Sequence, residues 1–192
     1  MSQETLFEID YRTLNLRGLT YQITHPENPP HIDRGLGAIR YKAKVIRLRV
    51  DYKVDKDFPW NSVDSGFDYT LGYRRLMDMI FKTKKKPDNF ELADATHLAA
   101  VREKLILPSF KRDGVIFAIG RPRPHSKGLL VGCLPSGENH ARDFYLPEWT
   151  SGEVAIPSVG NSKSALEFQA MLNSKGFPAG TGFLVVSRVA ES

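Results

Sequence analysis

Residues 42–55, with the sequence KAKVIRLRVDYKVD, alternate between apolar and charged side chains with a period of two. One parity is apolar (Ile46, Leu48, Val50, Tyr52 and Val54) and the other is charged (Arg47, Arg49, Asp51 and Lys53). This period predicts a long β-strand with one face on a core and the other in water. Such a strand is typical of an antiparallel sheet, so the chain is expected to build its core on one side of a sheet.

Other segments predict the partners of this strand. Residues 10–23 form a second strand candidate, and a Pro- and Gly-rich loop joins the two. Helical spacing of apolar residues predicts one helix over 69–81 and a second that begins at Asn89. Residues 114–120 and 128–134 predict two more strands. The expected fold is therefore α+β, an antiparallel sheet with two helices in β-β-α-α-β-β order.

The last part of the chain follows a different pattern. A loop-rich segment comes first, and then a predicted helix over 162–176 and a predicted strand over 181–189. We expect residues 1–135 to form one domain and residues 136–192 to form a C-terminal extension packed on it.

Composition limits the class of protein. A chain of 192 residues with 41% hydrophobic residues is long enough to bury one core. The single cysteine, Cys133, excludes an internal disulfide and favours a reducing compartment. No apolar run approaches the roughly 20 residues of a membrane span, and the N-terminus has no signal-peptide core, so a cytoplasmic protein is expected. The net charge of +5 suits an anionic partner without selecting one.

Five strings in the chain resemble dihydroneopterin aldolase, a family of pterin-binding T-fold (tunnelling-fold) proteins. The strings are LNLRGLTYQITHPEN, KVIRLRVDYKVD, DSGFDYTLGYRRLMDMI, FELADATHLAAVREKLI and VIFAIGRPRP, within about residues 10–134. The resemblance implies a T-fold that assembles into a tetramer or octamer, with sites between subunits. It also implies aldolase or epimerase chemistry on 7,8-dihydroneopterin or a related pterin, with no metal, Schiff base or other cofactor.

Asp94 and Glu27 are the candidate substrate-binding residues. Asp94 lies four residues before Leu98, on the same helical face as a buried stripe, where an unpaired carboxylate is destabilising. The resemblance makes Asp94 the carboxylate that accepts hydrogen bonds from the amino group and ring N–H of a pterin. Two alternatives remain, a simple role at the helix start and a register that puts Thr96 in this position. The resemblance places Glu27 beside the substrate side chain, whereas a solvated loop glutamate is the plainer interpretation.

Tyr69, Arg121 and Lys127 are the candidate catalytic residues, by the same resemblance. Tyr69 matches the pocket tyrosine of the family, although it also suits a partly buried residue that opens a helix. Arg121 stands where the family has a lysine that exchanges protons during retro-aldol cleavage. An arginine keeps its proton, so it can hold an oxyanion but is a poor base. Lys127 is the nearby amine that can replace the lysine, unless it is a solvated loop charge.

Two alternative functions stay open. The C-terminal segment faintly resembles basic RNA-binding proteins of the ferredoxin-like kind in CRISPR ribonucleoproteins, with phosphates held by a set of basic side chains. That set is Lys82, Lys84, Lys85, Lys86, Arg121 and Arg123. The other alternative is a catalytically inactive T-fold module. The five histidines show no HxH or HExxH spacing, so no metal site is expected.

Overall fold

The structure is a computed structural model that describes residues 4–24, 26–48, 52–53, 89–105, 114–125, 128–147, 176–177 and 179–190. The helix predicted over 69–81 lies outside these residues, as does nearly all of the helix predicted over 162–176.

Strands dominate the described part of the chain. The strands are β1 (Thr5–Asp10), β2 (Tyr21–Gln22), β3 (Ala38–Arg47), β4 (Tyr52–Lys53), β5 (Glu91–Leu92), β6 (Ile116–His125), β7 (Gly128–Leu134), β8 (Ala141–Pro147), β9 (Gly176–Phe177) and β10 (Gly182–Arg188). The helical elements are the 3₁₀ turns η1 (Arg17–Leu19) and η2 (Arg34–Leu36) and the α-helix α2 (Ala95–Leu105). The fold class is α+β, as predicted, and α2 is the single α-helix within the described ranges.

Most strands join one eight-stranded sheet in the order β1-β3-β10-β6-β7-β8-β2, with β5 paired to β10 beside this path. The sheet is mixed, since β10 runs parallel to β6 and β2 runs parallel to β8. The other pairs in it are antiparallel. A separate two-stranded sheet joins β4 to β9. The expectation of a purely antiparallel sheet is therefore wrong in two of its pairings.

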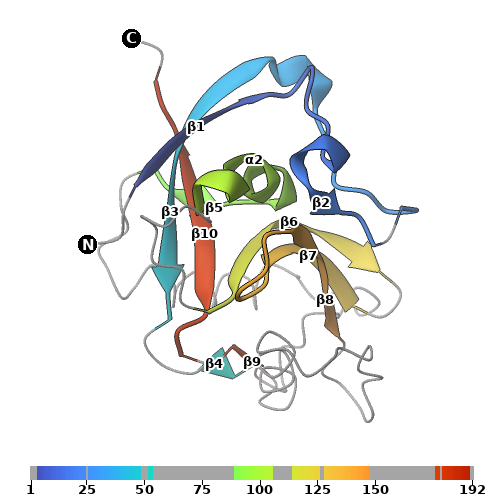
Figure 1. The fold of residues 1–192 in the computed structure, drawn as a ribbon, viewed down its shortest axis with the longest axis vertical. Helices are drawn as coiled ribbons and strands as arrows, with labels where there is room; N and C mark the ends of the chain where they lie inside the picture. The colour runs from blue at the N-terminus through green and yellow to red at the C-terminus, as the bar shows by residue number, and fades with distance from the viewer. Residues whose placement is uncertain are drawn as a thin grey trace, which may run out of the picture.

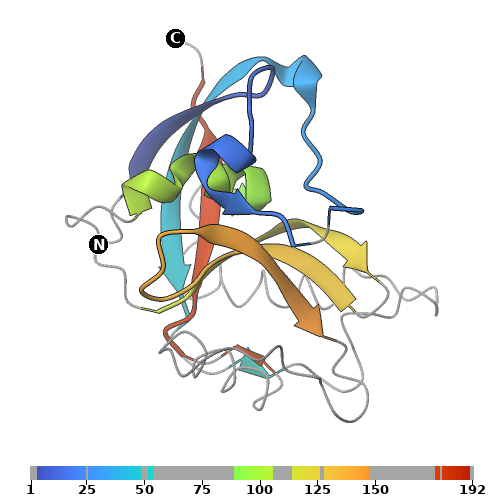
Figure 2. The same cartoon turned by 45° about the vertical axis from the view of Figure 1, so that its right-hand side comes forward.

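The main sheet curls around α2. β1 and β2 stand at opposite ends of the strand order, yet only a turn and η1 separate them along the chain. The sheet must bend so that both edges lie near one place, and α2 occupies the hollow, against β1, β6, β7 and β8. Figures 1 and 2 show α2 between β1 and β3 on one side and the β6–β8 strands on the other.

The core lies between α2 and the concave face of the sheet. The stripe predicted for this helix is confirmed, because Leu98, Val101 and Leu105 are all buried. Opposite them, Tyr41 and Ala43 of β3 are also buried. No helix among the described residues is long and apolar enough to cross a membrane.

The other face of the sheet carries an aromatic cluster. Phe117 of β6, Phe177 of β9 and Phe183 of β10 pack with ring centroids 5.1–6.2 Å apart. All three side chains are buried. The middle strands are therefore covered on both faces, which explains why β10 is buried from Gly182 to Ser187 with no alternation.

The strand predicted over 42–55 is wrong in its length. β3 ends at Arg47, opposite Gly182, where its partner strand begins. Leu48 still pairs with the backbone of Thr181 and Gly180, and the left-handed φ of 89° at Gly180 then turns the chain away. The hydrogen-bond ladder between β3 and β10 ends there because the two segments diverge, and residues 52–53 belong to the separate β4-β9 sheet.

Two other predicted elements differ in their bounds. The strand predicted over 10–23 is replaced by a turn, η1 and the two residues of β2, and β1 comes before it. The second helix begins at Ala95, because β5 at residues 91–92 pairs with β10. The strands at 114–120 and 128–134 are confirmed, with β6 continuing to His125.

The C-terminal part of the chain contributes strands to the same sheet. The strand expected over 181–189 is confirmed as β10, and it lies between β3 and β6. β8, within a segment expected to be loop-rich, pairs with β7. The domain boundary expected at residue 135 stays a prediction. In the sheet, β7 and β6, which precede this residue, pair with β8 and β10, which follow it.

Candidate functional site

Asp94 caps the N-terminus of α2. Its Oδ1 accepts hydrogen bonds from the backbone N–H of Thr96 at 3.0 Å and of His97 at 3.1 Å. Its carbonyl oxygen accepts the first helical bond, from Leu98 N–H at 3.1 Å. Asp is a favoured residue at this position because its oxygen satisfies N–H groups that lack a helical partner. The carboxylate beside the apolar stripe therefore has partners in the first turn of its own helix.

Side chains of the same turn also bind Asp94. The Thr96 hydroxyl donates to Oδ1, and His97 Nδ1 lies 2.7 Å from the same oxygen. Burial raises the pKa of Asp94, but the hydrogen bonds and charge of His97, together with the Thr96 hydroxyl, outweigh burial and lower this pKa from 3.8 to about 2. Asp94 is therefore a buried, ionised carboxylate near neutral pH.

This lowered pKa predicts an acid-dependent loss of stability. The carboxylate stabilises the fold above its unfolded pKa of about 3.8, and this contribution disappears as the pH falls through the folded pKa of about 2. We expect about 2 kcal/mol of the free energy of unfolding to be lost between pH 4 and pH 2 through this group. Urea unfolding across this range checks it, and Asp94→Asn should flatten the profile by a similar amount. An unchanged profile in the variant would contradict this role.

His97 joins the carboxylate to two buried tyrosines. Tyr11 OH lies 3.5 Å from His97 Nε2 and 2.9 Å from Tyr41 OH. The rings of Tyr41 and His97 meet edge to face, with centroids 4.8 Å apart. Burial, together with the Tyr41 hydroxyl, raises the pKa of Tyr11. His97 is 7% exposed, because Tyr11 of the turn after β1 and Tyr41 of β3 close over it.

Arg121 reaches the start of α2 through an irregularity in β6. The β6–β7 register shifts between Ala118 and Arg123, and Arg121 has a left-handed φ of 47°. Before it, Gly120 donates its N–H to Ala93 O at 2.8 Å. A Cβ at Gly120 would lie 2.3 Å from Leu92 O, so a glycine is needed for this contact. The bulge holds Arg121, in an unfavourable backbone conformation, beside the residues that precede α2.

Arg123 belongs to a buried ion pair. Its guanidinium donates to both carboxylate oxygens of Asp143 on β8 and to the carbonyl oxygen of Asn28. The Tyr21 hydroxyl donates to Asp143 Oδ1 at 2.8 Å. The Asp143 side chain is fully buried, and burial raises the pKa of Tyr21. The pair ties β2, β6 and β8 together.

A small pocket lies between these groups, with a volume of about 40 Å³. The described residues that line it are Pro30, His31, Asp94, Ala95, Thr96, Arg121 and Arg123. It therefore presents a buried anion from α2, an exposed cation from the β6 bulge and a second cation that Asp143 already neutralises. Because these charges nearly cancel, the pocket suits a neutral ring with hydrogen-bond donors and acceptors on one edge.

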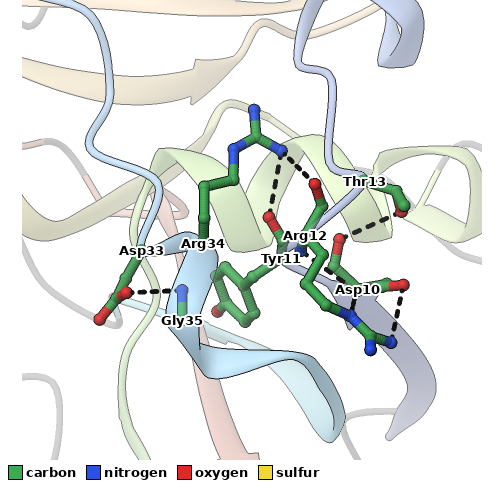
Figure 3. Close-up of polar contacts among 7 residues, drawn as sticks. All are labelled: Asp10, Tyr11, Arg12, Thr13, Asp33, Arg34 and Gly35. Carbon is green, nitrogen blue, oxygen red and sulfur yellow. Dashed lines mark hydrogen bonds and ion pairs between the residues drawn. The ribbon is translucent and has the colours of Figure 1, made fainter.

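A larger, open hollow of about 330 Å³ lies between β1, η1 and α2. Its carboxylates are engaged by arginines, Glu8 with Arg40 at 3.1 Å and Asp10 with Arg12 at 2.9 Å. Figure 3 shows the second pair beside the turn that Arg34 binds through its bonds to backbone carbonyls. All of these side chains but Asp10 are exposed to solvent, so the smaller pocket is the better candidate site.

The structure brings two of the five predicted site residues together. Asp94 and Arg121 line one pocket, although they were expected on a helix and a strand far apart in the chain. Glu27 is exposed and is not among the described residues that line this pocket. Tyr69 and Lys127 lie outside the described residues, so their roles stay predictions.

Sequence reasoning did not predict His97 as a partner of Asp94, or Asp143 as the partner of Arg123. The His97 signal was present, since a histidine three residues after a cap residue stands in the first helical turn, where side chain and cap can meet. Asp143 gave no comparable signal, because its partner lies on another strand.

No protein-family model, curated protein or solved structure matches this chain. No cluster of three or more potential metal ligands of the His, Cys, Asp and Glu types occurs in the part of the chain that the structure describes.

Proposed function

We propose that the protein binds a pterin or a closely related 2-amino-4-oxopyrimidine ring in the Asp94–Arg121 pocket and acts on it as an aldolase- or epimerase-like enzyme. The observation that carries the proposal is that Asp94 and Arg121, chosen from the sequence as a ligand anchor and a charged site residue, line the same pocket. The resemblance of five strings in the chain to dihydroneopterin aldolase supports the choice of ring.

The chemistry of the pocket suits one edge of this ring. A pterin presents an amino group, a ring N–H and a carbonyl oxygen in sequence along one edge. Asp94 supplies a carboxylate that accepts from N–H donors, and Arg121 supplies donors for the oxygen. A phosphate suits the pocket less well, because the ionised Asp94 would repel it and Arg123 is already paired.

The size of the pocket favours a site shared between subunits. Small-molecule sites usually have volumes of about 300–1,000 Å³, whereas this pocket has about 40 Å³. A second copy of the chain can supply the missing wall, as the proposed T-fold ring, a tetramer or octamer, requires. Light scattering checks the assembly, and a monomer at micromolar concentration would contradict it.

Asp94→Asn tests the ligand anchor. Asn is as good a helix cap as Asp, so Oδ1 keeps its backbone bonds, but the other carboxylate oxygen becomes an N–H₂ donor that faces ring donors. We expect neopterin and guanine to raise the melting temperature of the wild type. Calorimetry should show that the variant loses on the order of 1–3 kcal/mol of binding free energy.

Asp33→Asn is the matched control, because Asp33 caps η2 by accepting from Gly35 N–H at 3.0 Å and lies outside the set of described residues that line the pocket. Figure 3 shows this cap. Equal affinities in wild type and Asp94→Asn would remove Asp94 from the site. Salt-sensitive RNA binding without ring binding would instead favour the RNA-binding alternative.

Arg121→Lys tests the reaction. Arginine stays protonated, so wild type should cleave 7,8-dihydroneopterin slowly or not at all unless Tyr69 or Lys127 exchanges the proton. A lysine restores an amine that can titrate, and we expect a gain of about 10², the low end of what general acid–base catalysis contributes. Glycolaldehyde release measures the rate. Fast release by wild type with no gain in the variant would contradict this account of Arg121.

A further inference from the structure

The Asp94 carboxylate is bound asymmetrically. Within the described residues, all of its hydrogen bonds end on Oδ1: two backbone N–H groups, the Thr96 hydroxyl and the His97 ring. An ordinary cap needs only the backbone bonds. The additional side-chain donors fix the rotation of the carboxylate, and its other oxygen, Oδ2, belongs to a residue that lines the pocket.

The position of the proton on His97 follows from the geometry. Nδ1 lies 2.7 Å from Asp94 Oδ1 and also 3.3 Å from the Asp94 backbone N–H. One nitrogen cannot donate to the first and accept from the second in the same tautomer. The shorter contact is with an ionised carboxylate, which only accepts, so Nδ1 must carry the proton. Nε2 faces the Tyr11 hydroxyl at 3.5 Å and is an acceptor for it in the neutral ring, and this hydroxyl in turn contacts Tyr41.

We propose that His97 is a positioning residue for this site: its Nδ1–H occupies Asp94 Oδ1 and so leaves Oδ2 as the acceptor for an N–H donor of a bound ring. Tyr11 and Tyr41 select the tautomer that makes this possible. The inference rests on the proposed function for its ligand, but the hydrogen bonds that it invokes belong to the protein alone.

Two substitutions separate this role from a general packing role. In His97→Asn, the side-chain amide N–H₂ lies close to the place of Nδ1 and can still donate to Oδ1. In His97→Gln, the amide lies further along the side chain, near the place of Nε2, and the donor to Oδ1 is lost. Both variants remove the ring and its packing, so a packing role predicts similar effects for the two.

The first experiment needs no ligand. Nitrogen-15 NMR of labelled wild type should show a proton on Nδ1 of His97. The carboxyl carbon of Asp94 should titrate at higher pH than wild type in both variants, because both lose the charge of His97, and at higher pH in His97→Gln than in His97→Asn, which keeps a donor to Oδ1. An Nε2–H tautomer, or equal titration in the two variants, would overturn the inference whatever the protein binds.

The second experiment uses neopterin and guanine as probes in calorimetry. His97→Asn should bind within about threefold of wild type and His97→Gln about tenfold more weakly. Equal affinities would overturn the positioning role. If wild type binds neither ring, the proposed function fails, and the Asp94 titration alone then decides whether His97 orients the carboxylate. Circular dichroism confirms that each variant is folded.

Discussion

Asp143→Ala is expected to lower the free energy of unfolding by about 3–5 kcal/mol. The substitution removes a fully buried carboxylate and leaves the Arg123 guanidinium as a buried charge whose remaining acceptor, among the described residues, is the Asn28 carbonyl. The Tyr21 hydroxyl loses its acceptor at the same time. Arg123 lies on β6 and Tyr21 lies on β2, at the two ends of the β6-β7-β8-β2 part of the sheet. The substitution should therefore destabilise all of this part. Urea unfolding followed by circular dichroism measures it.

Two comparisons identify the cause of the effect. Asp10→Ala removes a half-buried carboxylate from its pair with the exposed Arg12 and should change stability far less, because water screens that pair. The double variant Asp143→Leu with Arg123→Met replaces both charges with apolar groups and should recover most of the loss. A double variant as unstable as Asp143→Ala would show that the unpaired Arg123 charge is not responsible, and would leave the Tyr21 hydroxyl without its acceptor as the cause.

The elements that sequence reasoning predicted correctly are those whose signal is local. The stripe of α2 repeats at helical spacing, and burial against the sheet follows from that spacing. The β6–β7 pair is likewise given by two apolar runs close together in the chain. The error in the strand over 42–55 has a non-local cause, because β3 ends where β10 departs, and β10 begins at residue 182. Periodicity carries no information about where a distant partner strand begins.

In the candidate site, too, local sequence signals were predictive and contacts between distant residues were not. Asp94 could be selected from the sequence because a carboxylate beside an apolar stripe requires a partner. The identity of that partner was harder to predict, since His97 is buried by Tyr11, 86 residues earlier, and by Tyr41 on a different strand. The bulge that places Arg121 near Asp94 depends on contact between Gly120 and the segment before α2, and no local pattern shows this contact.

That contact leads to the second large effect, in Gly120→Ala. A methyl group at this position would lie 2.3 Å from Leu92 O and 2.9 Å from the carbonyl of Ala93, and both are backbone atoms that cannot turn aside. The strand and the segment before α2 must separate, which breaks the bond from Gly120 N–H to Ala93 O. We expect a loss of about 3 kcal/mol or more, and a fall in melting temperature of about 10 °C, measured by differential scanning calorimetry.

Gly18→Ala in η1 is the matched control for Gly120→Ala. The atoms nearest to its new methyl group would be those of the Asn15 side chain, at 3.7 Å or more, an ordinary contact distance. Its stability should change by no more than about 1 kcal/mol, and a small gain is expected because alanine restricts the unfolded chain. A second effect is expected for Gly120→Ala. If Gly120 aligns Arg121 with Asp94, the variant protein should also bind neopterin more weakly at temperatures where it remains folded. Full stability in Gly120→Ala would show that β6 does not approach the start of α2 as closely as this account of the site requires.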